Sequence, residues 1–232
     1  LQPGAVNNTT GLFTNLNANS YTITAQDANN CSISTVILIT QPTQLTWQST
    51  SQTNVSCFGG SDASITLSAN GGTGTLTYTL QPGAISNTTG IFTGLNATNY
   101  SITVVDINNC STSTPVLITE PTVLQITNIV STIPSCVPGN DASLTITASG
   151  GTTSYTYDIG AGPQASNVFS NLGPATYTVV ATDANLCTAS SVYIITSPNA
   201  PSITSATASF ANCFGSSDAI IQVSATDRKS VV

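Results

Sequence analysis

One motif of 19 residues occurs three times in this chain, and it limits the possible folds more than any other feature. Each copy keeps Phe, Leu, Tyr, Asp and Cys at the same spacing, and the copies run Phe13 to Cys31, Phe92 to Cys110 and Phe169 to Cys187. Tyr100, Ile102 and Val104 alternate with Ser101, Thr103 and Val105, which is typical of a half-buried strand. Asp106 to Asn109 then favour a turn into a hairpin. The regular spacing predicts tandem copies of one β-structured unit.

Matching cysteines and prolines set the length and the boundaries of the repeat. Cys57 and Cys136 are 79 residues apart, and Cys136 and Cys213 are 77 apart. Each boundary is expected at a Thr-x-Pro segment, because proline removes a donor from the strand ladder. We therefore expect four pieces of repeat: the second part of one in 1–43, complete repeats in 44–122 and 123–199, and the first part of another in 200–226.

The pattern inside one repeat predicts six or seven short strands and no helix. The first strand is expected to run from about Leu45 to Cys57, and a second alternating segment starts at Ala63. Gly71-Gly72 breaks this segment, and further strands follow. We expect an all-β fold of tandem immunoglobulin-like β-sandwich modules with a repeat of about 77–79 residues. The expected core residues of the recurring motif are Phe92, Leu95 and Tyr100.

The composition excludes several classes of protein. Charged residues make up 5% of the chain, the formal net charge is −7, and there is no His. Because a phosphate backbone is held by cations, no nucleic-acid partner is expected. No apolar run is long enough to span a bilayer. Arg228 and Lys229 lie in the segment 227–232, which fits no repeat position and is expected to be a non-native tail; Leu1 aligns with Leu80, so we expect an internal fragment that lacks the natural start.

The cysteines predict structural disulfides. Counting strands places Cys57 and Cys110 at the same end of one sandwich, which favours a bond within the repeat, and Cys136 and Cys187 are expected to pair likewise. A competing arrangement joins neighbours across a boundary, such as Cys31 with Cys57. A zinc site is a third interpretation, but the chain has no C-x-x-C and no His. Paired cysteines imply an oxidising, extracellular setting.

Six of the nine acidic residues recur at equivalent repeat positions, namely Asp27, Asp106 and Asp183 in the hairpin turn and Asp62, Asp141 and Asp218 before the second strand. One interpretation is a calcium site between Asp62 and Asp106, and likewise between Asp141 and Asp183, since calcium prefers oxygen ligands. The alternative is that each Asp accepts hydrogen bonds from its own turn. No other cofactor or metal is expected.

Catalysis is not expected in this chain. There is no His, no Lys or Arg before Arg228, and the recurring Asp residues repeat like scaffold positions. The single Trp, Trp47, has no counterpart in the next repeat, where Ile126 stands. It is expected to pack in the core or between domains, although a sugar-binding platform is the alternative.

Three motifs together are similar to a known family. Cys57-Phe-Gly-Gly-Ser-Asp-Ala-Ser-Ile65, Gly71-Gly-Thr73, and Asn99 to Asp106 with Cys110 resemble the SprB-type repeat of Bacteroidota surface proteins. The resemblance covers essentially residues 1–226. The chain departs from the family where the latter often has Gly, at Ala63, Ala142 and Ala219 and at Asn30, Asn109 and Leu186. The resemblance implies very large, tandemly repeated cell-surface adhesins, one of which supports gliding motility, exported by type IX secretion.

The expected function is that of a non-enzymatic repeat segment of a secreted cell-surface adhesin, acting as adhesive or stalk modules. Its expected partners are neighbouring repeats of the same chain and extracellular polysaccharide or protein ligands. Two alternatives are carbohydrate-binding modules and spacer domains within a large exported enzyme. Carbohydrate binding requires an exposed row of aromatic residues, whereas Phe92 and Tyr100 fall on the expected core face.

Overall fold

The computed structural model describes residues 1–226, and all regular elements in that part of the chain are β-strands. Within these residues no helix has the length and apolar character needed to cross a membrane. The chain forms two compact units. The first combines Leu1–Thr53 with Ser64–Ile118, and the second combines Asn54–Ala63 with the described residues from Thr119 onward. The expected tail 227–232 lies outside the described residues.

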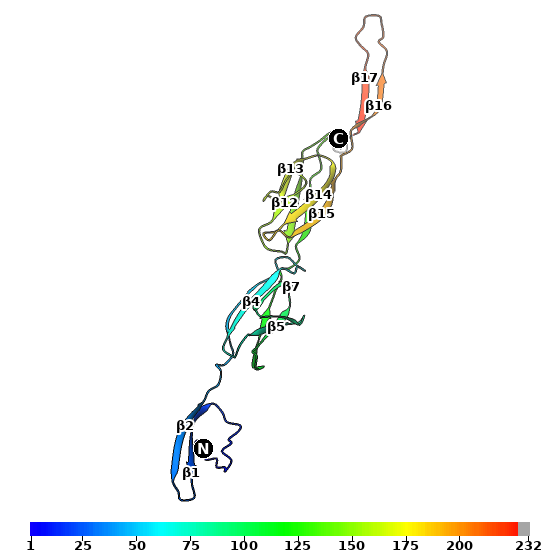
Figure 1. Cartoon of the computed structure of the whole chain (residues 1–232). Helices are drawn as coiled ribbons and strands as arrows, with labels where there is room; N and C mark the ends of the chain where they lie inside the picture. The colour runs from blue at the N-terminus through cyan, green and yellow to red at the C-terminus, as the bar shows by residue number, and fades with distance from the viewer. Residues whose placement is uncertain (227–232) are drawn as a thin grey trace. The chain divides into compact units, whose positions relative to one another are not determined.

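The first unit contains a two-sheet sandwich with a further hairpin (Figure 1). The sheets have the strand orders β3-β4-β7 and β6-β5-β8-β9, and β1 pairs with β2 separately. The strand pairs β1–β2, β3–β4, β5–β6, β5–β8 and β8–β9 are antiparallel. The strands are β1 (Asn19–Gln26), β2 (Ser32–Ile39), β3 (Thr46–Thr53), β4 (Ala63–Asn70), β5 (Thr77–Gln81), β6 (Ile85–Asn87), β7 (Ile91–Leu95), β8 (Asn99–Val105) and β9 (Ser111–Leu117).

Alternating apolar residues build the core of this sandwich. Tyr100, Ile102 and Val104 of β8 are buried, while Ser101 between them is exposed, so the predicted period of two is confirmed. Phe92 and Leu95 are also buried, as expected. The two sheets are linked by a hydrogen bond of 3.1 Å from the Ala69 backbone N–H to the Tyr78 hydroxyl.

The second unit repeats this arrangement with fewer strands. Its sheets have the orders β10-β11-β13 and β12-β14-β15, and β16 pairs with β17 separately (Figure 1). The strands are β10 (Gln125–Ser131), β11 (Ala142–Ser149), β12 (Thr156–Asp158), β13 (Val168–Leu172), β14 (Ala175–Thr182), β15 (Thr188–Ile195), β16 (Ser202–Ala208) and β17 (Ile221–Thr226). One buried cluster joins Ile146 and Phe169 of the first sheet to Tyr157 and Val179 of the second. The all-β, tandem-sandwich prediction is therefore confirmed.

The first strand of the repeat is shorter than its sequence predicts. β3 ends at Thr53 and does not reach Cys57. The segment 54–63 between β3 and β4 belongs to the second unit, where the Val55 N–H donates to the Thr119 carbonyl at 3.0 Å. Val55 is apolar and alternates with Thr53, so the local pattern resembled a strand. Its backbone partner lies outside the β3 sheet, which alternation alone cannot reveal.

Candidate functional site: a cysteine loop and its socket

The hairpin turn of each repeat is built around one aspartate. The Asp183 Oδ1 atom accepts hydrogen bonds from the backbone N–H groups of Asn185 and Cys187, both at 2.9 Å. Its Oδ2 atom accepts one from the Thr152 N–H at 2.8 Å. The carboxylate thus fixes the turn and fastens it to the Gly-Gly-Thr segment, which is the Asx-turn alternative that the sequence left open.

The other two turns use the same arrangement. Asp106 accepts from Asn108, Cys110 and Thr73 at 2.8–2.9 Å, and Asp27 accepts from Asn29 and Cys31 at 2.8 Å. Burial acts to raise the pKa of Asp106, but the hydrogen bonds from Thr73, Cys110 and Asn108 outweigh it and hold the pKa below its ordinary value. The turn therefore favours the ionised carboxylate.

A Gly-Gly pair lies directly against each complete turn. A Cβ atom on Gly151 would meet the Asp183 Oδ2 atom at 2.4 Å, and one on Gly150 would meet the Val123 carbonyl oxygen at 1.9 Å. Both glycines also have positive φ, 82° and 62° for Gly150 and Gly151. Only glycine allows this approach without displacing the backbone.

Residues 54–63 form what we call the cysteine loop, which is held by Asp62. This carboxylate accepts from the Ser56 N–H at 3.0 Å and from the Ser56 hydroxyl. The side-chain and backbone hydrogen bonds from Ser56 hold the pKa of Asp62 below its ordinary value. The same frame recurs with the Ser135 N–H on Asp141 at 2.9 Å and the Asn212 N–H on Asp218 at 3.2 Å.

A disulfide joins the cysteine loop to the turn of the following repeat. Cys57 and Cys187 are bonded with an S–S length of 2.02 Å and a Cα–Cα distance of 5.7 Å. We call the surrounding residues 119–124, 150–152 and 183–188 the Cys187 socket. Since Cys57 belongs to the repeat 44–122 and Cys187 to the repeat 123–199, the bond connects two successive repeats of the sequence.

Hydrogen bonds also hold the loop in the Cys187 socket. The Asn185 side-chain amide donates to the Ser56 carbonyl at 3.0 Å, and the Gly59 N–H donates to the Glu120 carboxylate at 2.6 Å. The Thr119 N–H donates to the Asn54 side chain at 3.1 Å. Sequence reasoning missed Asn185 and Glu120 as contact residues. The recurrence of Asn two positions before each turn cysteine was the available signal for the first of them.

This bond corrects the predicted cysteine pairing. Cys110 and Cys136 are free and exposed, so neither Cys57–Cys110 nor Cys136–Cys187 is formed, and Cys31 is also free. The turn before Cys110 lies beside Gly72, whose N–H donates to the Thr43 carbonyl just before β3 begins. The cysteine loop leaves β3 at its other end, and eight residues of strand span about 26 Å. The strand count had placed both cysteines at the same end.

The carboxylates of the candidate calcium residues already accept hydrogen bonds within their own turns and loops. Asp62 and Asp141 bind their own cysteine loops, whereas Asp106 and Asp183 bind their own hairpin turns. No group of three or more His, Cys, Asp or Glu side chains suited to a metal ion is found among residues 1–226. Because backbone N–H groups already occupy carboxylate oxygens that a calcium ion needs, the fit to calcium is poor. Calcium binding stays the less favoured interpretation of these residues.

Trp47 is half-buried and packs against the facing sheet of the first sandwich. Its ring centroid lies 6.2 Å from that of Tyr78 in a tilted arrangement, so the aromatic pair joins β3 to β5 of the facing sheet. The indole nitrogen is buried and has no hydrogen-bond partner in the described chain. The core-packing interpretation of Trp47 therefore agrees with its surroundings.

Comparisons with known proteins match two segments of the chain to a repeat family. The family model described as SprB repeat matches residues 49–85, which contain the cysteine loop, and residues 128–163, which contain the equivalent segment around Cys136. No curated protein matches the chain. Domains 1-6 of the surface layer protein SbsC are 11% identical with a TM-score of 0.33, and the S-layer protein rSbsC(31-844) is 11% identical with a TM-score of 0.31. Each comparison covers 94% of this chain but 45% of the S-layer chain.

Proposed function

We propose that this chain, whose residues 49–85 and 128–163 are SprB repeats, is a non-enzymatic, load-bearing segment of an extracellular surface protein. The observation that carries the proposal is the disulfide between successive repeats. A covalent bond between residues 57 and 187 transmits a pulling force past the polypeptide that lies between them. The segment then acts as a stalk that extends reach without unfolding.

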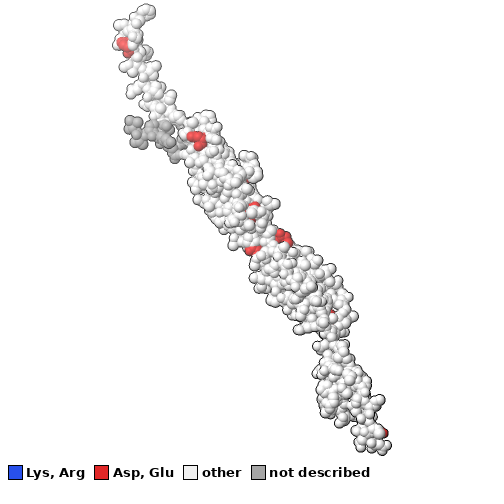
Figure 2. Space-filling model, turned by 90° about the vertical axis from the view of Figure 1, so that its left-hand side faces the viewer, with Lys and Arg blue, Asp and Glu red and all other residues white. Residues whose placement is uncertain are grey.

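The surface composition supports this role. Charged side chains are sparse on the face of the molecule that Figure 2 shows, and the sequence holds 5% charged residues. A polar surface with little charge limits ionic attraction to other macromolecules, which suits a spacer. The adhesin setting, with export to the cell surface by type IX secretion and a part in gliding motility in Bacteroidota, belongs to the proposal and is supported by the SprB repeats.

The recurring aromatic residues argue against carbohydrate-binding modules. Phe92 and Tyr100 are 3% and 7% exposed, so neither ring offers a face on which a sugar can stack. Ligand recognition by an adhesin of this kind would then fall to loops or to other domains of the protein. The recurring Asp carboxylates are engaged in turn hydrogen bonds, which supports a structural rather than a catalytic role.

Single-molecule pulling on the full chain from its two ends tests the load-bearing role. With the disulfide intact, the residues between Cys57 and Cys187, which are 130 positions apart, stay shielded from the force. Reduction should increase the final extension by about 45 nm, since each extended residue contributes about 3.3–3.6 Å. C57S in oxidising buffer should behave like the reduced protein. Equal extension of the oxidised and reduced chains would contradict the proposal.

A further inference from the structure

The turn around Cys110 has the same framework as the Cys187 socket. We call the residues 40–45, 71–73 and 106–111 the Cys110 socket. In both sockets a Thr-x-Pro-Thr linker precedes the first strand, and its second Thr carbonyl accepts from a glycine N–H: Thr43 from Gly72 at 2.9 Å, and Thr122 from Gly151 at 2.8 Å. The aspartate of each turn binds the Thr of its own Gly-Gly-Thr segment at 2.8 Å.

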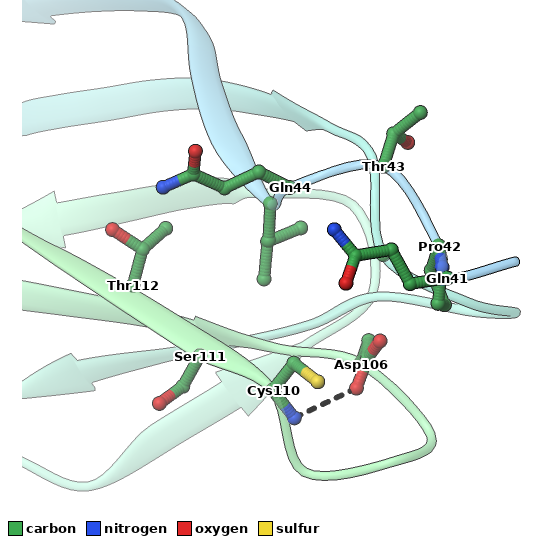
Figure 3. A pocket seen from close by; sticks show the side chains of 10 residues that line it. Gln41, Pro42, Thr43, Gln44, Asp106, Cys110, Ser111 and Thr112 are labelled. Carbon is green, nitrogen blue, oxygen red and sulfur yellow. Dashed lines mark hydrogen bonds between the residues drawn. The ribbon is translucent and has the colours of Figure 1, made fainter. Parts of the chain in front are cut away.

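A cavity of about 350 Å³ lies in the Cys110 socket. Figure 3 shows Gln41 above Asp106 and the Cys110 thiol, with Gln44 and Thr112 at the other side. The corresponding cavity of the Cys187 socket, of about 340 Å³, is bordered by Leu124, Leu186 and Cys187 and also by Cys57 and Phe58 of the cysteine loop. The same place in the repeat therefore holds a bonded loop in one unit and an exposed thiol in the other.

We propose that the Cys110 socket binds the cysteine loop of a preceding SprB repeat and closes on it with a disulfide at Cys110. The occupant is a loop with the sequence features of residues 54–63, namely a cysteine after a small polar residue and an aspartate five positions further on. In a tandem array, the first cysteine of every repeat then bonds the second cysteine of the repeat that follows.

The socket already has the hydrogen-bonding groups for the other contacts. Asn108 occupies the repeat position of Asn185, whose side-chain amide donates to the Ser56 carbonyl at 3.0 Å. Gln41 occupies the repeat position of Glu120, whose carboxylate accepts from the Gly59 N–H at 2.6 Å. The amide oxygen of a glutamine can accept the same hydrogen bond. Thr40 occupies the repeat position of Thr119, whose backbone carbonyl accepts from the Val55 N–H at 3.0 Å. All three contacts carry over with groups of matching hydrogen-bonding character.

The loop around Cys136 supplies the reciprocal half of the arrangement. The Ser135 N–H binds Asp141 at 2.9 Å, as the Ser56 N–H binds Asp62, and Cys136 is exposed and free. This loop is therefore shaped as the occupant for the socket of a following repeat. In the Cys57–Cys187 bond, the first cysteine of one repeat pairs with the second cysteine of the next. The same pairing assigns partners in neighbouring repeats to the free cysteines Cys110 and Cys136.

The bond forms by thiol–disulfide exchange with a low-molecular-weight disulfide such as oxidised glutathione. The Cys110 thiolate attacks that disulfide, forms a mixed disulfide and releases one glutathione thiolate. The loop cysteine, as a thiolate, then attacks the Cys110 sulfur and expels the second glutathione. Two protein thiols lose two electrons and two protons in total, and one oxidised glutathione becomes two reduced molecules.

A synthetic peptide of residues 54–63, Asn-Val-Ser-Cys-Phe-Gly-Gly-Ser-Asp-Ala, tests the proposal on the full chain. After equilibration in a glutathione redox buffer, mass spectrometry measures the mixed disulfide at each free cysteine. We expect at least tenfold more peptide on Cys110 than on Cys136 or Cys213. Cys31 is an internal control, because no Thr-x-Pro linker or Gly-Gly pair precedes its turn in this chain. Equal coupling at all four cysteines, or equal coupling of a scrambled peptide, would overturn the proposal.

Two variants separate the socket from simple thiol exposure. Gln41→Ala and Asn108→Ala should each lower peptide coupling at Cys110 several-fold, because each removes a contact to the loop. Gln44→Ala is the matched control, since Gln44 lines the same cavity but Val123 replaces it in the Cys187 socket. If the amount of peptide bonded to Cys110 is the same in all three variants as in the unaltered chain, the proposed socket is contradicted. The stalk function would stand even then, because its pulling experiment depends on the Cys57–Cys187 bond alone.

Discussion

The turns that end in Cys187 and in Cys110 share their internal structure but differ in their bonding. Both aspartates accept the same three backbone N–H groups, and both turns lie on a Gly-Gly pair. Only Cys187 is bonded, to a cysteine 130 residues earlier. Each repeat therefore builds its own socket locally, whereas the bond requires a loop from the repeat before it.

The largest effect on this comparison should come from removing the bond. Cys57→Ser deletes a crosslink that closes a loop of 130 residues, for which the chain-entropy model gives about 5 kcal/mol of stability in the second unit. Native-state hydrogen exchange of amides in β14 and β15 measures the loss. Cys110→Ser is the control and should leave exchange unchanged, because Cys110 is unbonded. Equal protection in the two variants would contradict the account.

The next largest effect should come from the glycine pairs, and it should be alike in both sockets. Gly150→Ala and Gly71→Ala would place a Cβ 1.9 Å and 2.1 Å from carbonyl oxygens, so each should cost about 3 kcal/mol. Gly162→Ala is the control, since its φ is also positive but nothing lies within 4 Å. Urea unfolding followed by circular dichroism measures all three. If Gly150→Ala loses no more free energy of unfolding than Gly162→Ala, the close approach of Gly150 to the Val123 carbonyl does not restrict this position.

Acid should weaken the first unit through Asp106. The pKa of this carboxyl is held below its ordinary value in the folded chain, so its stabilising effect is complete above the ordinary value. That effect is lost as the pH falls through the folded-state pKa, when the turn loses its charged acceptor. Melting temperatures between neutral and strongly acidic pH measure the loss. Asp106→Asn should flatten the acid limb of this profile, and an unchanged acid limb would contradict the assigned cause.

A gain of about 1 kcal/mol is expected from Leu186→Gly. Leu186 has a φ of 66° and is 80% exposed, so it bears left-handed strain with little burial in return. Asn109, the equivalent residue beside Cys110, has a φ of 63° but tolerates this region better. Asn109→Gly should therefore gain less than Leu186→Gly when both are measured by urea unfolding. A destabilised Leu186→Gly variant would contradict this ranking.

The smallest effect is expected from calcium. Because Asp62 and Asp106 are each satisfied within their own turns, millimolar calcium should leave the melting temperature unchanged. Chelator in place of calcium serves as the reference condition. A saturable rise in melting temperature, lost in Asp62→Asn, would establish the calcium site instead.

The sequence predicted those features that depend on neighbouring residues. Alternation along β8 identified the buried face of Tyr100 and Ile102, because side chains of a strand point to opposite sides in turn. The Asp106 turn was also recognisable, since Asp bonds the backbone two residues on. In each case the physical cause lies within a few residues of the feature.

The features that the sequence did not predict depend on residues far apart in the chain. The Val55 N–H bonds Thr119, so β3 stops at Thr53 despite a strand-like pattern that continues toward Cys57. The partner of Cys57 depends on which end of the sandwich each cysteine occupies. A count of strands without their pairing cannot decide that end, and it placed Cys110 at the wrong one.

Disulfide mapping of the oxidised full chain tests directly whether Cys57 is bonded to Cys187. After free thiols are alkylated, the chain is digested at aromatic and acidic residues, because trypsin finds no Lys or Arg before Arg228. The account predicts one linked pair of peptides containing Cys57 and Cys187, with alkylated Cys110 and Cys136. A linked pair containing Cys57 and Cys110 would contradict it.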